Sequence, residues 1–155
     1  MRILAAGGAN PLLTTEENVT PLMVAAGMGR EADRTEDGEE AKALEAVKVA
    51  VELGVDVNAS NKLGLTALHG ATFVGWNSVV QFLAEKGANL NAQDTVGQTP
   101  LHKALDIKPT VSVDRRLVST RPHQSTADLL LKLGATPVSP PLAQASGVGS
   151  ANATK

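Results

Sequence analysis

Residues 66–75 read "TALHGATFVG", and the chain returns to the same pattern at Thr99 with "TPLHKALDI". A Thr, a Leu and a His recur at the same offsets in both stretches. A further copy without the His, "NVTPLMVAAG", aligns on Thr20. A catalytic site needs its residues once, whereas a structural repeat needs them in every copy. The recurrence therefore indicates a repeat architecture.

Helical patterns fill the sequence between the copies. They are "ALEAVKVAVELG" (43–54), "SVVQFLAEKG" (78–87) and "STADLLLKLG" (125–134). Apolar residues recur in each at helical spacing, and each ends on a Gly, where the last turn of a helix favours a left-handed residue. Each repeat is thus expected to hold one helix that begins after its Thr and a second helix that ends at its Gly.

The composition limits the possible partners and chemistry. The chain has 155 residues, 43% of them hydrophobic, which is enough for one domain with a core. Its net charge of -2 lacks the broad positive field that attracts nucleic acid, so no nucleic-acid partner is expected. Aromatic residues make up 2% of the chain and Cys is absent, so the core must consist of Ala, Val and Leu, without disulfides.

The repeated unit resembles the ankyrin repeat, a turn followed by two antiparallel helices with a period of about 33 residues. The match is clearest over residues 58–91, "NASNKLGLTALHGATFVGWNSVVQFLAEKGANLN", and it extends over about residues 2–136. Met23, Ala67 and Lys103 depart from the residues that the family prefers, and each is expected to weaken its repeat. The resemblance implies an all-α solenoid of stacked helix-turn-helix units with short β-turn tips.

The chain is expected to divide into a repeat domain and a tail. The opening "RILAAGG" reads as the last turn of a helix whose first part is missing, so the natural protein is expected to begin earlier. The C-terminal stretch 136–155 is rich in Pro, Gly, Ser and Ala, as in a disordered tail or linker. The predicted units are a repeat domain over 1–136, with a partial repeat 1–13 and repeats at about 14–59, 60–92 and 93–136, and a tail over 137–155.

The repeated histidines are interpreted as structural. Thr66 and Thr99 sit where helices begin, and their hydroxyls can cap unpaired backbone N–H groups. His69 and His102 follow three residues later, from where a side chain can reach back in a capping box. Neighbouring repeats are separated by about 10 Å, too far for both histidines to bind one metal ion. His123 lies outside the pattern and is expected to be a solvated loop residue.

Other motifs are read as scaffold as well. Gly64 and Gly97, with Asn18 in the matching place, lie in turns that require a positive backbone angle. No phosphate loop, nucleophile elbow or paired-carboxylate motif occurs, so we expect no catalytic residues, no metal and no cofactor. No membrane association is expected, because the opening residues are too short for a signal peptide or a membrane span, and the chain as given is expected to be cytoplasmic.

Two inserts interrupt the regular spacing, both between the two helices of a repeat. The first, residues 27–40, contains six acidic residues against two Arg. The second, residues 106–124, contains four Lys or Arg against two Asp. One interpretation is that both are solvated loops of little consequence. The other is that loops of opposite sign form a recognition feature or close over Trp76, which lies between them in the middle repeat.

The resemblance implies protein recognition rather than catalysis. Family members bind partners through the turn tips and the exposed face of the first helix, and the expected state is a monomer unless the N-terminal flank pairs. The alternative is a regulatory or tethering segment of a larger enzyme or transport protein. The candidate partner-binding residues are Val19, Lys62, Leu63, Leu65, Phe73, Val74, Trp76, Thr95, Val96, Gln98, Asp106 and Ile107.

Overall fold

The computed structural model describes residues 10, 12–30, 38–106 and 122–137. Over these residues the chain forms six helices and no strand beyond an isolated antiparallel bridge between Ser60 and Thr66. This confirms the all-α prediction. The helices are α2 (Pro21–Ala25), α3 (Glu39–Glu52), α4 (Ala67–Val74), α5 (Asn77–Glu85), α6 (Pro100–Ala104) and α7 (Gln124–Leu133).

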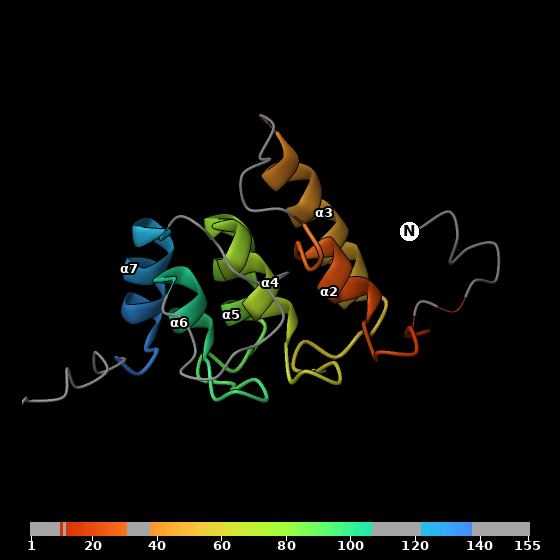
Figure 1. Cartoon of the computed structure of the whole chain (residues 1–155). Coiled ribbons are helices and arrows are strands. Elements are labelled where there is room, and N and C mark those ends of the chain that lie inside the picture. Colours follow the sequence, from red (N-terminus) through yellow and green to blue (C-terminus); the bar gives the residue numbers. More distant parts are fainter. Residues whose placement is uncertain (1–9, 11, 31–37, 107–121, 138–155) are drawn as a thin grey trace, which may run out of the picture.

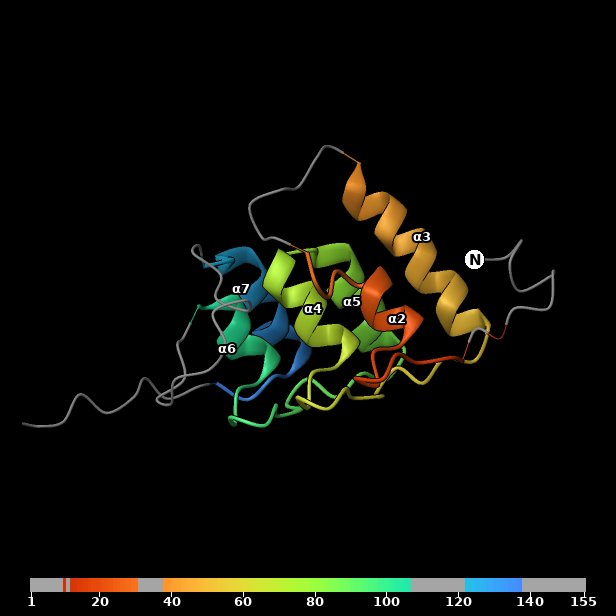
Figure 2. The same cartoon turned by 45° about the vertical axis from the view of Figure 1, so that its right-hand side comes forward.

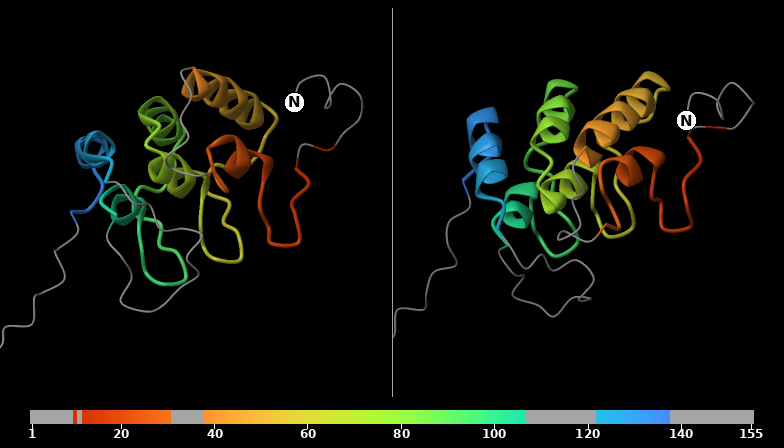
Figure 3. Two further views of the ribbon diagram at one scale, coloured as in Figure 1. Left: turned by 45° about the horizontal axis from the view of Figure 1, so that its top comes forward. Right: turned by 90° about the horizontal axis from the view of Figure 1, so that it is seen from above.

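The helices form two rows. Helices α2, α4 and α6 lie side by side in one row, and α3, α5 and α7 lie side by side in the other (Figures 1 and 3). Each short first helix packs on the longer second helix of its own repeat, and the loops that precede α4 and α6 project together to one side (Figure 2). The described chain is therefore a solenoid of three stacked helical hairpins.

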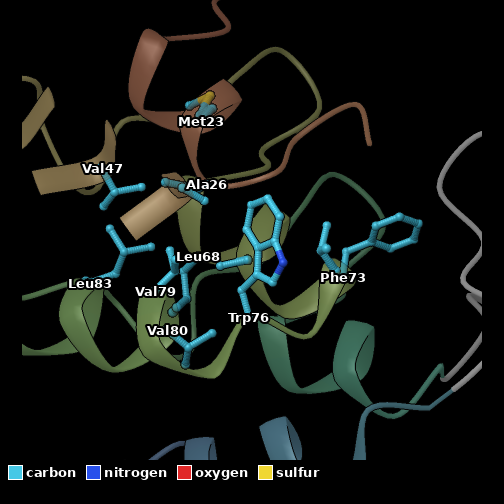
Figure 4. Packing of buried hydrophobic residues seen from close by; sticks show 14 of the residues in the cluster. Met23, Ala26, Val47, Leu68, Phe73, Trp76, Val79, Val80 and Leu83 are labelled. Atoms are coloured by element: carbon cyan, nitrogen blue, oxygen red, sulfur yellow. The ribbon is translucent and has the colours of Figure 1, made fainter. Parts of the chain in front are cut away.

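The core repeats the same positions in each hairpin. Leu22, Leu68 and Leu101 follow the repeated Thr by two residues, and all three are fully buried. Leu83 and Leu130 occupy matching positions in the second helices and are also fully buried. Figure 4 shows part of this core, in which Val, Leu and Ala side chains predominate, as the composition indicated.

Small residues let the first repeat lie close against the second. A Cβ added to Gly70 would lie 3.0 Å from the backbone nitrogen of Met28. A Cβ added to Gly27 would lie 2.8 Å from a methyl group of Val74 and 3.0 Å from the Trp76 ring. The end of α2 therefore rests on α4 at a distance that only side chains of minimal size allow.

Several predictions lie outside the described residues. Both inserts fall between the helices of a repeat, as expected, but residues 31–37 and 107–121 are not described. The same holds for residues 1–9 of the expected partial repeat and for residues 138–155 of the expected tail. The domain boundaries therefore stay a prediction.

The expectation for His123 is wrong, because this residue is seated between two repeats. Its backbone N–H donates to the carbonyl of Ala104, with an N···O distance of 2.7 Å. Its ring Nε2 lies 3.1 Å from the carbonyl oxygen of Phe73, and the ring covers Gly75. His123 thus ties the start of α7 to the bend between α4 and α5.

Replacing Gly75 with Ala is expected to lower the free energy of unfolding by about 2 kcal/mol. Gly75 ends α4 with a φ of 82°, a left-handed conformation that costs a non-glycine residue about 1–2 kcal/mol. The new Cβ would also lie 2.5 Å from Nδ1 of His123, so the ring would have to move. Urea denaturation measures the loss.

Gly87→Ala is the matched control for this prediction. Gly87 has a φ of 86°, but an added Cβ would meet no atom within 4 Å. Its substitution therefore costs only the strain of the left-handed backbone. Gly75→Ala should therefore destabilise more than Gly87→Ala, and the difference should shrink in a His123→Ala background. Equal losses in the two variants would contradict the contact between Gly75 and His123.

Candidate functional site

The two repeated histidines make capping boxes at the starts of α4 and α6, as predicted. The Nδ1 atom of His69 accepts the backbone N–H of Thr66 at 3.1 Å, and Nδ1 of His102 accepts the backbone N–H of Thr99 at 3.2 Å. Nε2 of His69 lies 3.2 Å from the carbonyl oxygen of Gln98. Because Nδ1 is an acceptor here, Nε2 carries the proton and donates it to that carbonyl.

Burial keeps these histidines neutral. It lowers the pKa of His69 from 6.5 to about 4, although the hydrogen bond to Gln98 and the charge of Asp94 act in the opposite direction. Burial also lowers the pKa of His102. The two neutral rings therefore cap the starts of α4 and α6. His69 also connects the second repeat to the third through its hydrogen bond to Gln98.

A buried ion pair joins the tip of the third repeat to α6. The Nζ atom of Lys103 lies 2.9 Å from Oδ2 of Asp94, and both side chains are less than a tenth exposed. Nζ also donates to Oε1 of Gln98 at 2.6 Å. Burial by itself would raise the pKa of Asp94, but the hydrogen bond and charge of Lys103 and the backbone N–H groups of Val96 and Gln98 outweigh it and lower the pKa. Lys103 therefore forms a buried ion pair within the third repeat.

The tips of successive repeats are joined by backbone hydrogen bonds. The N–H of Lys62 donates to the carbonyl of Glu17 at 3.0 Å, and the N–H of Thr95 donates to the carbonyl of Leu63 at 2.9 Å. We call these two bonds the tip ladder. The expected positive φ angles occur beside it, at 59° for Asn18, 74° for Gly64 and 78° for Gly97. The tips therefore form one continuous edge.

The structure divides the candidate partner-binding residues into two groups. Those at the accessible edge are exposed (Lys62, Leu63 and Thr95) or half-buried (Val19, Val96 and Asp106). The exposure expected of Leu65, Phe73, Val74 and Gln98 is wrong, because each is less than a tenth exposed. Trp76, for which shielding was one of the two interpretations, is buried as well. Ile107 lies outside the described residues. Binding itself stays a prediction for all twelve residues.

Two of the buried candidates still line a surface pit. Leu65 and Phe73 line it together with Met28 and Lys103. The pit encloses about 300 Å³ including its open mouth, and Gly70 contributes no side chain to it. Most of this volume is open to solvent, so the pit is a shallow apolar depression beside the first helices.

Trp76 is covered by the segment that follows α2 in the first repeat. Its side chain points toward the end of α2 (Figure 4), and the guanidinium carbon of Arg30 lies 5.4 Å from the ring centroid. Arg30 also pairs with Glu39 at the start of α3, and the carboxylate of Glu40 accepts hydrogen bonds from the backbone and hydroxyl of Ser78 on α5. The ends of the first insert are thus fixed beside the indole, which is 3% exposed.

Acrylamide is expected to quench Trp76 fluorescence weakly in the native chain, severalfold less than in urea, because the indole is inaccessible. Arg30→Ala should raise quenching by removing the guanidinium that covers the ring. Raising the salt concentration should have a much smaller effect, because the close approach of Gly27 to the indole does not depend on charge. Strong quenching of the native chain would contradict the burial of Trp76.

Comparison with known proteins assigns the architecture. Stacked helical hairpins with a hydrogen-bonded edge of tips define a helical repeat protein of the solenoid class. A family model described as ankyrin repeats, in three copies, matches residues 39–113. Residues 39–113 of the chain therefore consist of ankyrin repeats. No curated protein matches it.

The matched region starts in α3 and includes α4, α5 and α6. Thr20 and Met23 form a capping box at the start of α2. The repeat pattern therefore continues on the N-terminal side of the matched region. Ankyrin repeats generally act as protein–protein interaction modules and are typically non-catalytic. Over the described residues, no helix is long and apolar enough to cross a membrane, and no group of three His, Asp or Glu residues could hold a metal ion.

Proposed function

We propose that the chain is a non-enzymatic module that binds a protein partner along the edge of its tips and the adjoining pit. The exposed tip residues are Lys62, Leu63 and Thr95, and the pit of Leu65 and Phe73 lies beside them. A partner segment can contact the tips and pack against the apolar residues that line the pit. The alternative of a regulatory segment within a larger protein stays a prediction.

The single observation that carries the proposal is the apolar tip. Leu63 is 50% exposed although it belongs to a tip that is fixed on both sides by the tip ladder. Aliphatic side chains held on a rigid backbone in water favour association, because little conformational entropy is lost when a partner covers them. Half-buried Val96 occupies the matching position in the next tip.

Affinity capture with the full chain tests the proposal when it is paired with two variants. The tip variant is Leu63→Asp with Val96→Asp, and the control is Gln81→Asp, an exposed position on α5 in the other row of helices. Proteins that bind the native chain and the control but not the tip variant would support the proposal. Proteins that bind all three equally, or that are lost only with the control, would contradict it.

A further inference from the structure

The tip ladder has a regular register that continues at both ends of the array. Aligning the repeats on their Thr residues places Glu16 at the position of Lys62, and Val96 at the position of Leu63. The N–H of Glu16 is therefore the next donor and the carbonyl of Val96 the next acceptor. Neither group has a hydrogen-bond partner within the part of the chain that the structure describes.

An apolar side chain lies on the flank of the first repeat. Val24 of α2 occupies the position of Gly70 in α4, and Gly70 faces the preceding repeat at the backbone of Met28. By the same geometry, Val24 faces outward, where a preceding repeat would lie, and it is 56% exposed. Lys103 holds this position in the third repeat, so a side chain there is compatible with stacking.

A second apolar side chain lies on the opposite flank. Thr126 of α7 donates its hydroxyl hydrogen bond to Asn77 of α5, so this side of α7 faces the middle repeat. Leu131 follows five residues later, which is about 140° further round the helix. It therefore points away from the middle repeat, and it is 42% exposed.

The geometry points to a second copy of this chain as the occupant of these flanks, stacked head to tail. The third-repeat flank with Leu131 would lie against the first-repeat flank with Val24 of the next copy. The N–H of Glu16 in that copy would donate to the carbonyl of Val96, which extends the tip ladder by one bond. The contact continues the interface that already joins the repeats within one chain, and it is heterologous, because different surfaces meet.

Sedimentation of the full chain over a range of concentrations tests this inference. The weight-average mass should rise with concentration and pass that of a dimer, because each added copy leaves one flank free. Val24→Glu and Leu131→Glu should each weaken association at least about tenfold. Leu63→Glu, at a tip and on neither flank, should leave it unchanged, and circular dichroism verifies that the variants are folded.

Mixing the two flank variants gives the decisive result. Val24→Glu keeps an intact third-repeat flank and Leu131→Glu keeps an intact first-repeat flank, so an equimolar mixture should form dimers and nothing larger. A chain that stays monomeric up to about 1 mM would overturn the inference. So would a dimer that one variant abolishes and the other does not affect, since that result indicates a symmetric contact through a single flank.

Discussion

Asp94→Ala is expected to lower the free energy of unfolding by about 4 kcal/mol, in urea denaturation near pH 7. Removing one partner of a buried ion pair typically costs about 3–5 kcal/mol, because the other charge is left buried and unpaired. Here the remaining charge is the ammonium of Lys103, whose side chain is 9% exposed. The substitution also removes the acceptor for the N–H groups of Val96 and Gln98.

The middle repeat supplies the control for this prediction. Asn61 occupies the position of Asp94 and accepts the N–H groups of Leu63 and Leu65 in the same way, while Gly70 occupies the position of Lys103. The double variant Asp94→Asn, Lys103→Ala therefore reproduces a neutral arrangement that the chain already contains.

We expect this double variant to lose only about 1 kcal/mol, because no buried charge remains and the turn keeps its acceptor. A double-mutant cycle that compares it with Asp94→Asn alone and Lys103→Ala alone isolates the interaction energy of the pair. Losses that simply add would show that the ion pair contributes nothing specific.

Acidification is expected to destabilise the chain by about 3 kcal/mol between pH 6.5 and pH 4. In the folded state the pKa of His69 is about 4, below its ordinary value of 6.5. Within this window the unfolded chain binds a proton that the folded chain does not, so stability falls as the pH falls, by about 1.36 kcal/mol per pH unit. Above pH 6.5 the contribution of His69 is fully present and constant.

His69→Met is the matched variant, because Met23 holds the same position in the first repeat and its sulfur accepts the N–H of Thr20. Denaturation at several pH values should show a clearly shallower profile for the variant between pH 6.5 and 4, with a residual slope from His102, whose pKa is also lowered by burial. The pKa of Asp94 is also lowered, but its contribution to stability changes only below its ordinary pKa of 3.8. Asp94 therefore does not affect the profile between pH 6.5 and 4. An unchanged slope in His69→Met would assign the pH dependence to another group.

The local elements of this fold were predictable from the sequence, because their signals lie within a few residues of each other. The Thr and His pairs that cap α4 and α6 are three residues apart, and the turn glycines lie beside them. The family resemblance then ordered these units into a stack. The helices and their pairing follow from such short-range rules.

The errors concern contacts between residues that are far apart in the chain. Val74 was expected on the exposed face of the first helix, but the small size of Gly27 lets the first repeat close over it. His123 was expected in solvent, yet it contacts Phe73 in the preceding repeat. No local pattern encodes such contacts, because they depend on how closely the repeats stack.

The tip ladder gives each junction between repeats its own spectroscopic probe. The amide proton of Lys62 is held across the junction of the first and second repeats, and that of Thr95 across the junction of the second and third. In a solenoid each unit touches only its neighbours, so separation can start at either end. Hydrogen exchange at these two amides would therefore tell whether the array frays from one end or opens as a whole.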